Sequence, residues 1–150
     1  GELTCQTVPA LVLTPRAAPP TSRASDGLLE ASEIAGLSLN ADLVVLSACN
    51  TAAGRDLGGE AMSGLSEAFF HAGARNMLAT HWQVPSAATA SLMTGLFTDI
   101  QGDRMNAADA LRASQMRLIA DERTAHPFFW AAFVLMGDGG VATQMAGAGQ

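Results

Sequence analysis

The sequence predicts an α/β sandwich with a mostly parallel β-sheet, and three observations support this fold class. Residues 43–48 form an unbroken run of apolar or small side chains, which is typical of a parallel strand covered on both faces. A helical pattern and a second apolar run follow, in the order of a strand–helix–strand crossover. Strands and helices also alternate along most of the chain, as they do in this fold class.

The first predicted elements are short. Residues 9–14 predict a strand, and the Pro-, Ser- and Arg-rich residues 15–25 predict a loop. Residues 31–35 predict one or two helical turns, which are expected to end at Gly36.

The crossover after residues 43–48 is predicted from helical spacing. Apolar residues recur at helical intervals over residues 60–72, and Gly73 is expected to end this helix. Residues 75–80 then predict a second buried strand. Ligands of such sheets lie beyond the carboxyl ends of the parallel strands, and Cys49 and His81 both follow such an end.

Two helices and a last strand are predicted in the second half of the chain. Ser86 is the expected N-cap of the first helix. Asn106, with Asp109 three residues later, is expected to cap the second helix, which continues to about residue 119. Residues 132–135 predict the final strand.

The composition excludes several classes of protein. With 49% hydrophobic and 15% charged residues, the chain is too apolar for a disordered segment, yet it has no run long enough to span a membrane. The net charge is −6 and the eight basic residues, all Arg, are scattered, so neither nucleic acid nor a membrane is an expected partner. Cys5 and Cys49 lie in different settings, which disfavours a disulfide and indicates a reducing, cytoplasmic location.

Cys49 is the candidate nucleophile. It follows the apolar run and precedes Asn50 and a Gly-bearing loop, so its thiol is expected where a buried strand emerges toward solvent. Backbone N–H groups at such a place stabilise an oxyanion by about 2.7–4 kcal/mol per donor. The other interpretation of this pattern is a buried cysteine that packs as a small hydrophobic side chain.

Five motifs follow one another along the chain: Leu-Ser-Ala-Cys-Asn-Thr at 46–51, Gly-Gly-Glu-Ala at 58–61, Ala-Phe-Phe-His-Ala-Gly-Ala-Arg at 68–75, His-Trp-Gln-Val at 81–84 and Ala-His-Pro-Phe-Phe-Trp-Ala-Ala-Phe at 125–133. Together they resemble the CHAT domain, a family of caspase-like cysteine peptidases related in fold to caspases and separases. The resemblance implies a caspase-like three-layer αβα sandwich with its N-terminal strands missing. Residues 1–140 are then a partial CHAT domain, and residues 141–150 a flexible C-terminal tail.

The resemblance also implies an activity. A cysteine-type endopeptidase would hydrolyse a protein or peptide substrate through a thioester on Cys49, without a cofactor. Its base, a His in a Thr-His-Gly-type segment, is expected upstream of residue 1, so the chain as printed is expected to be inactive by itself. The alternative is a catalytically inactive caspase-like module for interaction or regulation. Kinship further implies a bacterial, cytoplasmic protein whose full-length chain carries TPR or other repeats.

A substrate pocket is expected around the two strand ends, from Ser47, Asn50, His81, Trp82, Gln83 and Val84. His81 could also approach the thiol as a substitute base, but the pocket-lining role is favoured. Related sequences carry acids for a basic P1 side chain in the loop that corresponds to residues 82–88, and residues 83–88 have none. A basic P1 preference is therefore in doubt, unless Asp56 or Glu60 contributes.

The remaining histidines and aromatic residues have structural interpretations. His71 lies near the end of a helix, where the helix dipole favours a cation. His126 is expected to supply a hydrogen bond that anchors the last connection. The aromatic side chains near the last strand are expected in the core: Phe128, Phe129, Trp130 and Phe133. No metal-ligand spacing occurs, and a flavodoxin-like nucleotide domain is disfavoured because no Gly-rich phosphate loop follows the first strand.

Overall fold

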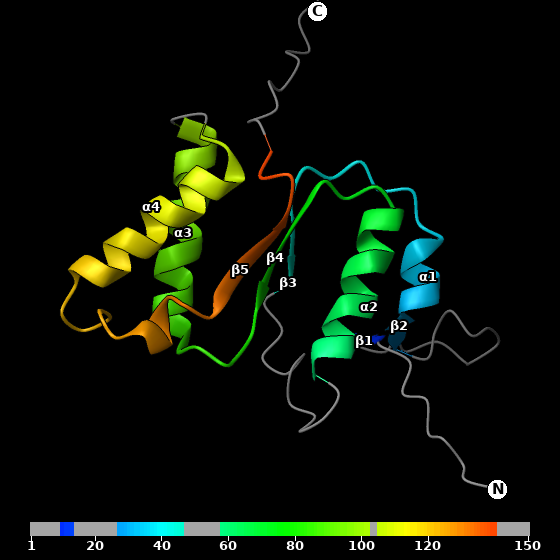
Figure 1. The fold of residues 1–150 in the computed structure, drawn as a ribbon, viewed down its shortest axis with the longest axis horizontal. Helices are drawn as coiled ribbons and strands as arrows, with labels where there is room; N and C mark the ends of the chain where they lie inside the picture. The colour runs from blue at the N-terminus through cyan, green and yellow to red at the C-terminus, as the bar shows by residue number, and fades with distance from the viewer. Residues whose placement is uncertain (1–9, 14–26, 47–57, 103–104, 141–150) are drawn as a thin grey trace, which may run out of the picture. The chain divides into compact units, whose positions relative to one another are not determined.

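The structure is a computed structural model that describes residues 10–13, 27–46, 58–102 and 105–140 (Figure 1). The chain divides into two compact units. Unit 1 consists of Gly1–Leu39 and Ala52–Gly73, and unit 2 consists of Asn40–Thr51 and Ala74–Gln150. Within the described ranges, no helix is both long enough and apolar enough to cross a membrane.

Unit 1 contains a two-stranded sheet and two helices. Strand β1 (Ala10–Val12) pairs antiparallel with β2 (Leu28–Glu30), and α1 (Ala31–Ala35) follows directly. The start of α1 is stabilised by a capping box, in which the Glu30 N–H donates to the Glu33 carboxylate at 2.9 Å. Helix α2 (Gly58–His71) lies beside α1.

The core of unit 1 lies between these two helices. Ile34 of α1 is fully buried, and Leu65 and Phe69 on α2 are buried. The predicted end of α2 is confirmed, because Gly73 follows it with a φ of 103°, a left-handed conformation that glycine adopts without steric penalty. The Leu39 N–H donates to the Ala72 carbonyl at 2.6 Å and so satisfies an acceptor at the end of this helix.

Unit 2 is built on a three-stranded mixed sheet with the order β3-β4-β5. Strand β3 (Val44–Leu46) is parallel to β4 (Asn76–Thr80), and β5 (Phe133–Gly137) is antiparallel to β4. The prediction of a mostly parallel sheet is wrong for the described strands, since the β1–β2 pair is antiparallel as well. Apolar runs reveal that a strand is buried but not its direction, and an antiparallel edge strand is common in α/β sheets.

Asn76 fixes the amino end of β4. Its buried amide donates to the Asp42 carbonyl at 3.0 Å, and its side-chain oxygen accepts from the Gly139 N–H at 2.9 Å. One side chain therefore joins the segment before β3, the start of β4 and the segment after β5. This side chain thereby fixes one end of each of the three strands, at the edge of the sheet opposite the candidate site.

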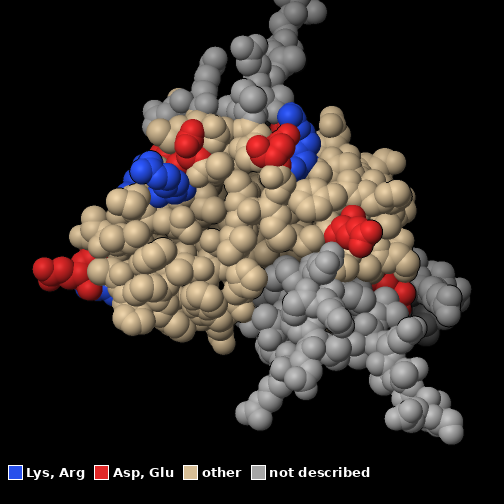
Figure 2. Space-filling model, viewed as in Figure 1, with Lys and Arg blue, Asp and Glu red and all other residues tan. Residues whose placement is uncertain are grey.

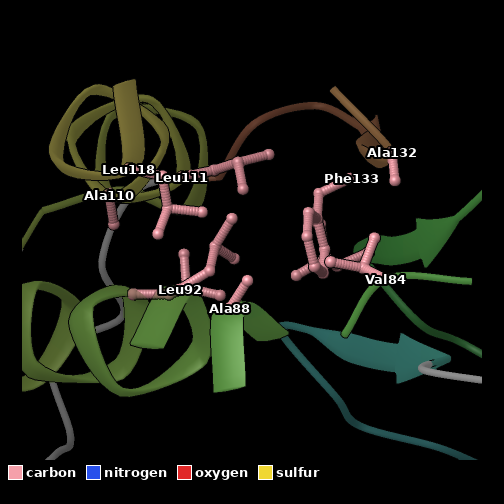
Figure 3. Close-up of a cluster of buried hydrophobic side chains, with 10 residues drawn as sticks. Val84, Ala88, Leu92, Ala110, Leu111, Leu118, Ala132 and Phe133 are labelled. Carbon is pink, nitrogen blue, oxygen red and sulfur yellow. The ribbon is translucent and has the colours of Figure 1, made fainter. Parts of the chain in front are cut away.

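Helices α3 (Ser86–Gly102) and α4 (Ala107–Ala120) pack against each other and supply most of the core of unit 2. Figure 3 shows Leu92 of α3 and Leu111 and Leu118 of α4 pointing into this core, together with Phe133 from β5. The predicted cap of α4 is confirmed, because the Asn106 side chain accepts from the Asp109 N–H at 2.8 Å.

Some predicted boundaries are wrong. Helix α3 begins at Ser86, and the Pro85 carbonyl accepts from the Thr89 N–H, so Pro85 rather than Ser86 is the N-cap. Strand β5 begins one residue later than predicted and ends two residues later. Strand β2 was not predicted, because three residues are too few to show an alternating pattern. The predicted tail, residues 141–150, lies outside the described residues.

Candidate active-site edge

The parallel pairing of β3 and β4 defines the candidate site. Leu46, the last residue of β3, is aligned with Ala79, so both strands end at the same edge of the sheet. Cys49 follows β3 by three residues, and residues 81–84 follow β4 directly. Ser47, Cys49 and Asn50 lie outside the described residues, so the described part of the site is the β4 side.

His81 and Val84 hold the loop after β4 in place. The His81 N–H donates to the Ala132 carbonyl at 2.9 Å, which continues the β4–β5 hydrogen bonding one residue beyond the strands. Val84 is buried in the core of unit 2. The side chains of His81 and Gln83 are exposed between these two anchors. Of the four predicted pocket residues in this loop, Val84 therefore anchors the loop. The side chains of His81, Trp82 and Gln83 face solvent.

Trp82 connects this loop to the segment before β5. Its indole Nε1–H donates to the Phe128 carbonyl at 2.9 Å. Phe128 lies in a 3₁₀ turn, Pro127–Phe129, and its backbone N–H donates to Nδ1 of His126 at 3.2 Å. The predicted structural role of His126 is thereby confirmed, since its imidazole caps the turn that leads into β5.

The structure corrects the interpretation of one aromatic residue. Phe133 is buried, and Phe129 and Trp130 pack against the core, as predicted. Phe128, however, is 44% exposed, so the prediction of a core position is wrong for this residue. The turn that begins at Pro127 places Phe128 outward while Phe129 packs inward, and the Pro in the sequence was the available signal.

The described part of the site carries no acidic or basic side chain other than histidine. Residues 81–88 and 125–131 include no Asp, Glu or Arg. On the face drawn in Figure 2, charged side chains form small separate groups among uncharged residues. In the described ranges, no group of three or more His, Cys, Asp or Glu side chains could hold a metal ion.

Two aspartates have a lowered pKa, and they lie on α3 and just after α4, outside the loop that follows β4. A hydrogen bond from Arg117, on α4, lowers the pKa of Asp99 on α3, and burial opposes this effect. Hydrogen bonds from Arg123 lower the pKa of Asp121, just after α4, to about 2. Both acids already have a cationic partner, so neither has the features of a catalytic acid or base.

A comparison with known families decides the kinship of the chain. The model of the CHAT domain matches residues 3–138, which is nearly the whole sequence. The chain belongs to the CHAT domain family. This family is caspase-like and related to peptidases. The resemblance predicted from the five motifs is therefore confirmed.

A curated relative of this CHAT domain is the mouse (Mus musculus) tetratricopeptide repeat protein 28. It is 31% identical over 110 residues, which cover 73% of this chain and 4% of the mouse protein. The chain thus spans a small part of its relative. No solved structure gives a significant match to the chain.

Proposed function

We propose that this CHAT domain is a cysteine-type endopeptidase domain with Cys49 as its nucleophile. The observation that carries the proposal is the parallel pairing of β3 and β4, with Leu46 beside Ala79. A residue that follows β3 and the loop that follows β4 start from the same edge of the sheet, where α/β enzymes bind their ligands. The match to a peptidase-related family supports the same role.

The proposed reaction has two steps. The Cys49 thiolate attacks the carbonyl carbon of the scissile peptide bond, the C–N bond breaks, and the leaving amine takes a proton from a histidine. Water then attacks the thioester, which releases the carboxylic acid and restores the thiol. The family resemblance assigns the histidine to a segment upstream of residue 1. The Cys49 N–H is the proposed donor to the oxyanion, and Ser47, Asn50, His81, Trp82 and Gln83 are the proposed pocket residues.

The wider setting of the domain is also part of this proposal. Residues 1–140 would form part of a caspase-like three-layer sandwich, and the full-length protein would carry tetratricopeptide or similar repeats. The name of the mouse relative supports the second statement.

The test is covalent labelling of the full-length protein with a thiol-directed peptidyl acyloxymethyl ketone. Labelling should occur in the wild type and be lost in Cys49→Ala. The matched control is Cys5→Ala, which removes the other cysteine of these 150 residues and should leave labelling unchanged. Equal labelling of the wild type and Cys49→Ala would remove Cys49 from the mechanism.

A non-catalytic interaction module is the second candidate. It is favoured by the absence of acidic residues from positions 83–88, where related peptidases bind a basic side chain. This candidate predicts that the intact protein neither reacts with the probe nor cleaves any peptide of a diverse library. Cleavage that is lost in Cys49→Ala would exclude it.

A further inference from the structure

Trp82 and Phe128 form a pair of exposed aromatic side chains at the carboxyl end of β4. Their exposed fractions are 40% and 44%, which is high for residues of this size. Trp82 follows the last residue of β4 by two positions, and Phe128 precedes β5 by five. The two side chains therefore belong to the edge of the sheet at which the candidate site lies.

Hydrogen bonds fix the Trp82 side chain and the backbone of Phe128 relative to each other. The Phe128 carbonyl accepts from Nε1 of Trp82, and the Phe128 N–H donates to His126. The ring of Phe128 packs edge-to-face on Phe129, with centroids 5.6 Å apart, and Phe129 packs against the core. A surface that is ordered before binding loses little conformational entropy when a ligand arrives.

The same hydrogen bonds make the exposed surface apolar. The indole N–H is the polar atom of the Trp82 side chain, and it already has a partner in Phe128. Both backbone polar groups of Phe128 are likewise engaged. What the pair offers to a ligand is therefore ring surface rather than a donor or an acceptor.

The two segments that carry the pair offer no counterion to a basic ligand group. The two segments that carry it, residues 81–88 and 125–131, have no carboxylate and no guanidinium. A Lys or Arg side chain of a ligand would find a ring face there, but no counterion to offset the water that it loses. An aliphatic or aromatic side chain would exchange contact with water for contact with exposed ring surface.

We propose that Trp82 and Phe128 form a subsite that binds an apolar side chain of the peptide substrate. The subsite rests on the proposed peptidase function and adds a specificity to it, namely selection of an aliphatic or aromatic residue near the scissile bond. Trp82 has a second role as a positioning residue, since its indole N–H fixes the carbonyl of Phe128.

The test uses the full-length protein and a set of peptidyl acyloxymethyl ketones that differ at one side chain. Leu, Phe, Gly or Arg is placed in turn at each of the four positions before the reactive group. At one position, Leu or Phe should label Cys49 about tenfold faster than Gly or Arg. Trp82→Ala and Phe128→Ala should each reduce this ratio to about twofold.

The control variant is Phe97→Ala. Phe97 lies on α3 and is 42% exposed, so the substitution removes an equally exposed aromatic ring that lies outside both segments, nine residues along the chain from the nearer one. It should leave the ratio unchanged. Trp82→Phe keeps an aromatic face without the N–H and should retain part of the preference, and far-UV circular dichroism checks that every variant is folded.

A second measurement separates this subsite from the peptidase chemistry. The indole N–H signal of Trp82 in the NMR spectrum, assigned with Trp82→Phe, should shift when a Leu-containing peptide amide without a reactive group is added. The Gly-containing peptide should leave it in place. Labelling of Cys49 with no difference between Leu and Gly, or a wild-type ratio in both Ala variants, would overturn the subsite and keep the peptidase.

The reverse result is equally informative. A shift of the Trp82 signal by the Leu peptide, without labelling of Cys49 by any probe, would overturn the peptidase and keep an apolar peptide-binding surface. The absence of both labelling and shift would overturn both proposals.

Discussion

Two aspartate–arginine pairs of this chain differ in what they contribute to stability. Asp99 and Arg117 form a bidentate pair with N···O distances of 2.8 Å, and the Asp99 side chain is only 4% exposed. Asp121 and Arg123 are also 2.8 Å apart, but both lie in solvent to a much larger extent. The pKa of Asp121 falls to about 2, yet water and salt screen an exposed pair, so we expect Asp99 to matter more.

Asp99→Asn should lower the melting temperature by several degrees at pH 7, whereas Asp121→Asn should change it little. Arg117 holds the pKa of Asp99 below its usual value, so the ionised pair stabilises the fold fully above about pH 4. That contribution is lost as the pH falls through the lowered pKa. Thermal melts from pH 7 to pH 2 should show the difference between wild type and Asp99→Asn narrowing only below pH 4, and a constant difference would contradict this account.

The glycines at the ends of α2 and α3 differ in whether the backbone requires them. Gly73 follows α2 with a φ of 103°, and a Cβ at this position would collide with the Leu39 carbonyl oxygen. Gly102 is the last residue of α3 and has no positive φ, and a Cβ there would meet no described atom within 4 Å. The two glycines look alike in the sequence, but only the first is required by the backbone.

Gly73→Ala should therefore lower the free energy of unfolding by about 1–3 kcal/mol or more, because the backbone must move or remain strained. Gly102→Ala should be neutral or stabilise the protein by up to about 1 kcal/mol, because alanine restricts the unfolded chain. Urea denaturation followed by circular dichroism measures both values. Equal destabilisation by the two substitutions would show that the left-handed conformation of Gly73 does not cause the loss of stability.

At the scale of the whole molecule, the stability of unit 2 depends on one core. Leu92 of α3 is buried against α4 and the sheet, whereas Met116 of α4 is 52% exposed. Both tryptophans of the chain, Trp82 and Trp130, belong to unit 2. Their fluorescence therefore reports the unfolding of this unit.

Leu92→Ala should lower the free energy of unfolding seen by tryptophan fluorescence by about 2–5 kcal/mol, because it leaves a cavity in a packed interior. Met116→Ala removes a similar volume from the surface and should change that value by less than about 0.5 kcal/mol. The urea dependence should keep its slope in both variants. A loss of similar size in both would mean that the assigned core does not stabilise unit 2.

The sequence predicted most elements because their signals are local. The helical spacing of apolar residues located α2 and α4 within two residues, and Asn106 with Asp109 identified a cap that the structure confirms. The apolar run before Cys49 located β3. Kinship with the CHAT domain was also readable from the sequence, because five motifs in order are specific even without coordinates.

The tertiary structure decided what depends on contacts between distant residues. The direction of β5 follows from its pairing with β4, and burial does not encode direction. The exposure of Phe128 follows from the turn at Pro127. Its neighbour Phe129 has the same side chain but packs inward. Composition and local periodicity thus indicated the α/β fold class and the strand-end position of Cys49, and the five motifs identified the family. Strand direction and the aromatic pair were decided by long-range hydrogen bonds, such as that from Trp82 to Phe128, which no short segment encodes.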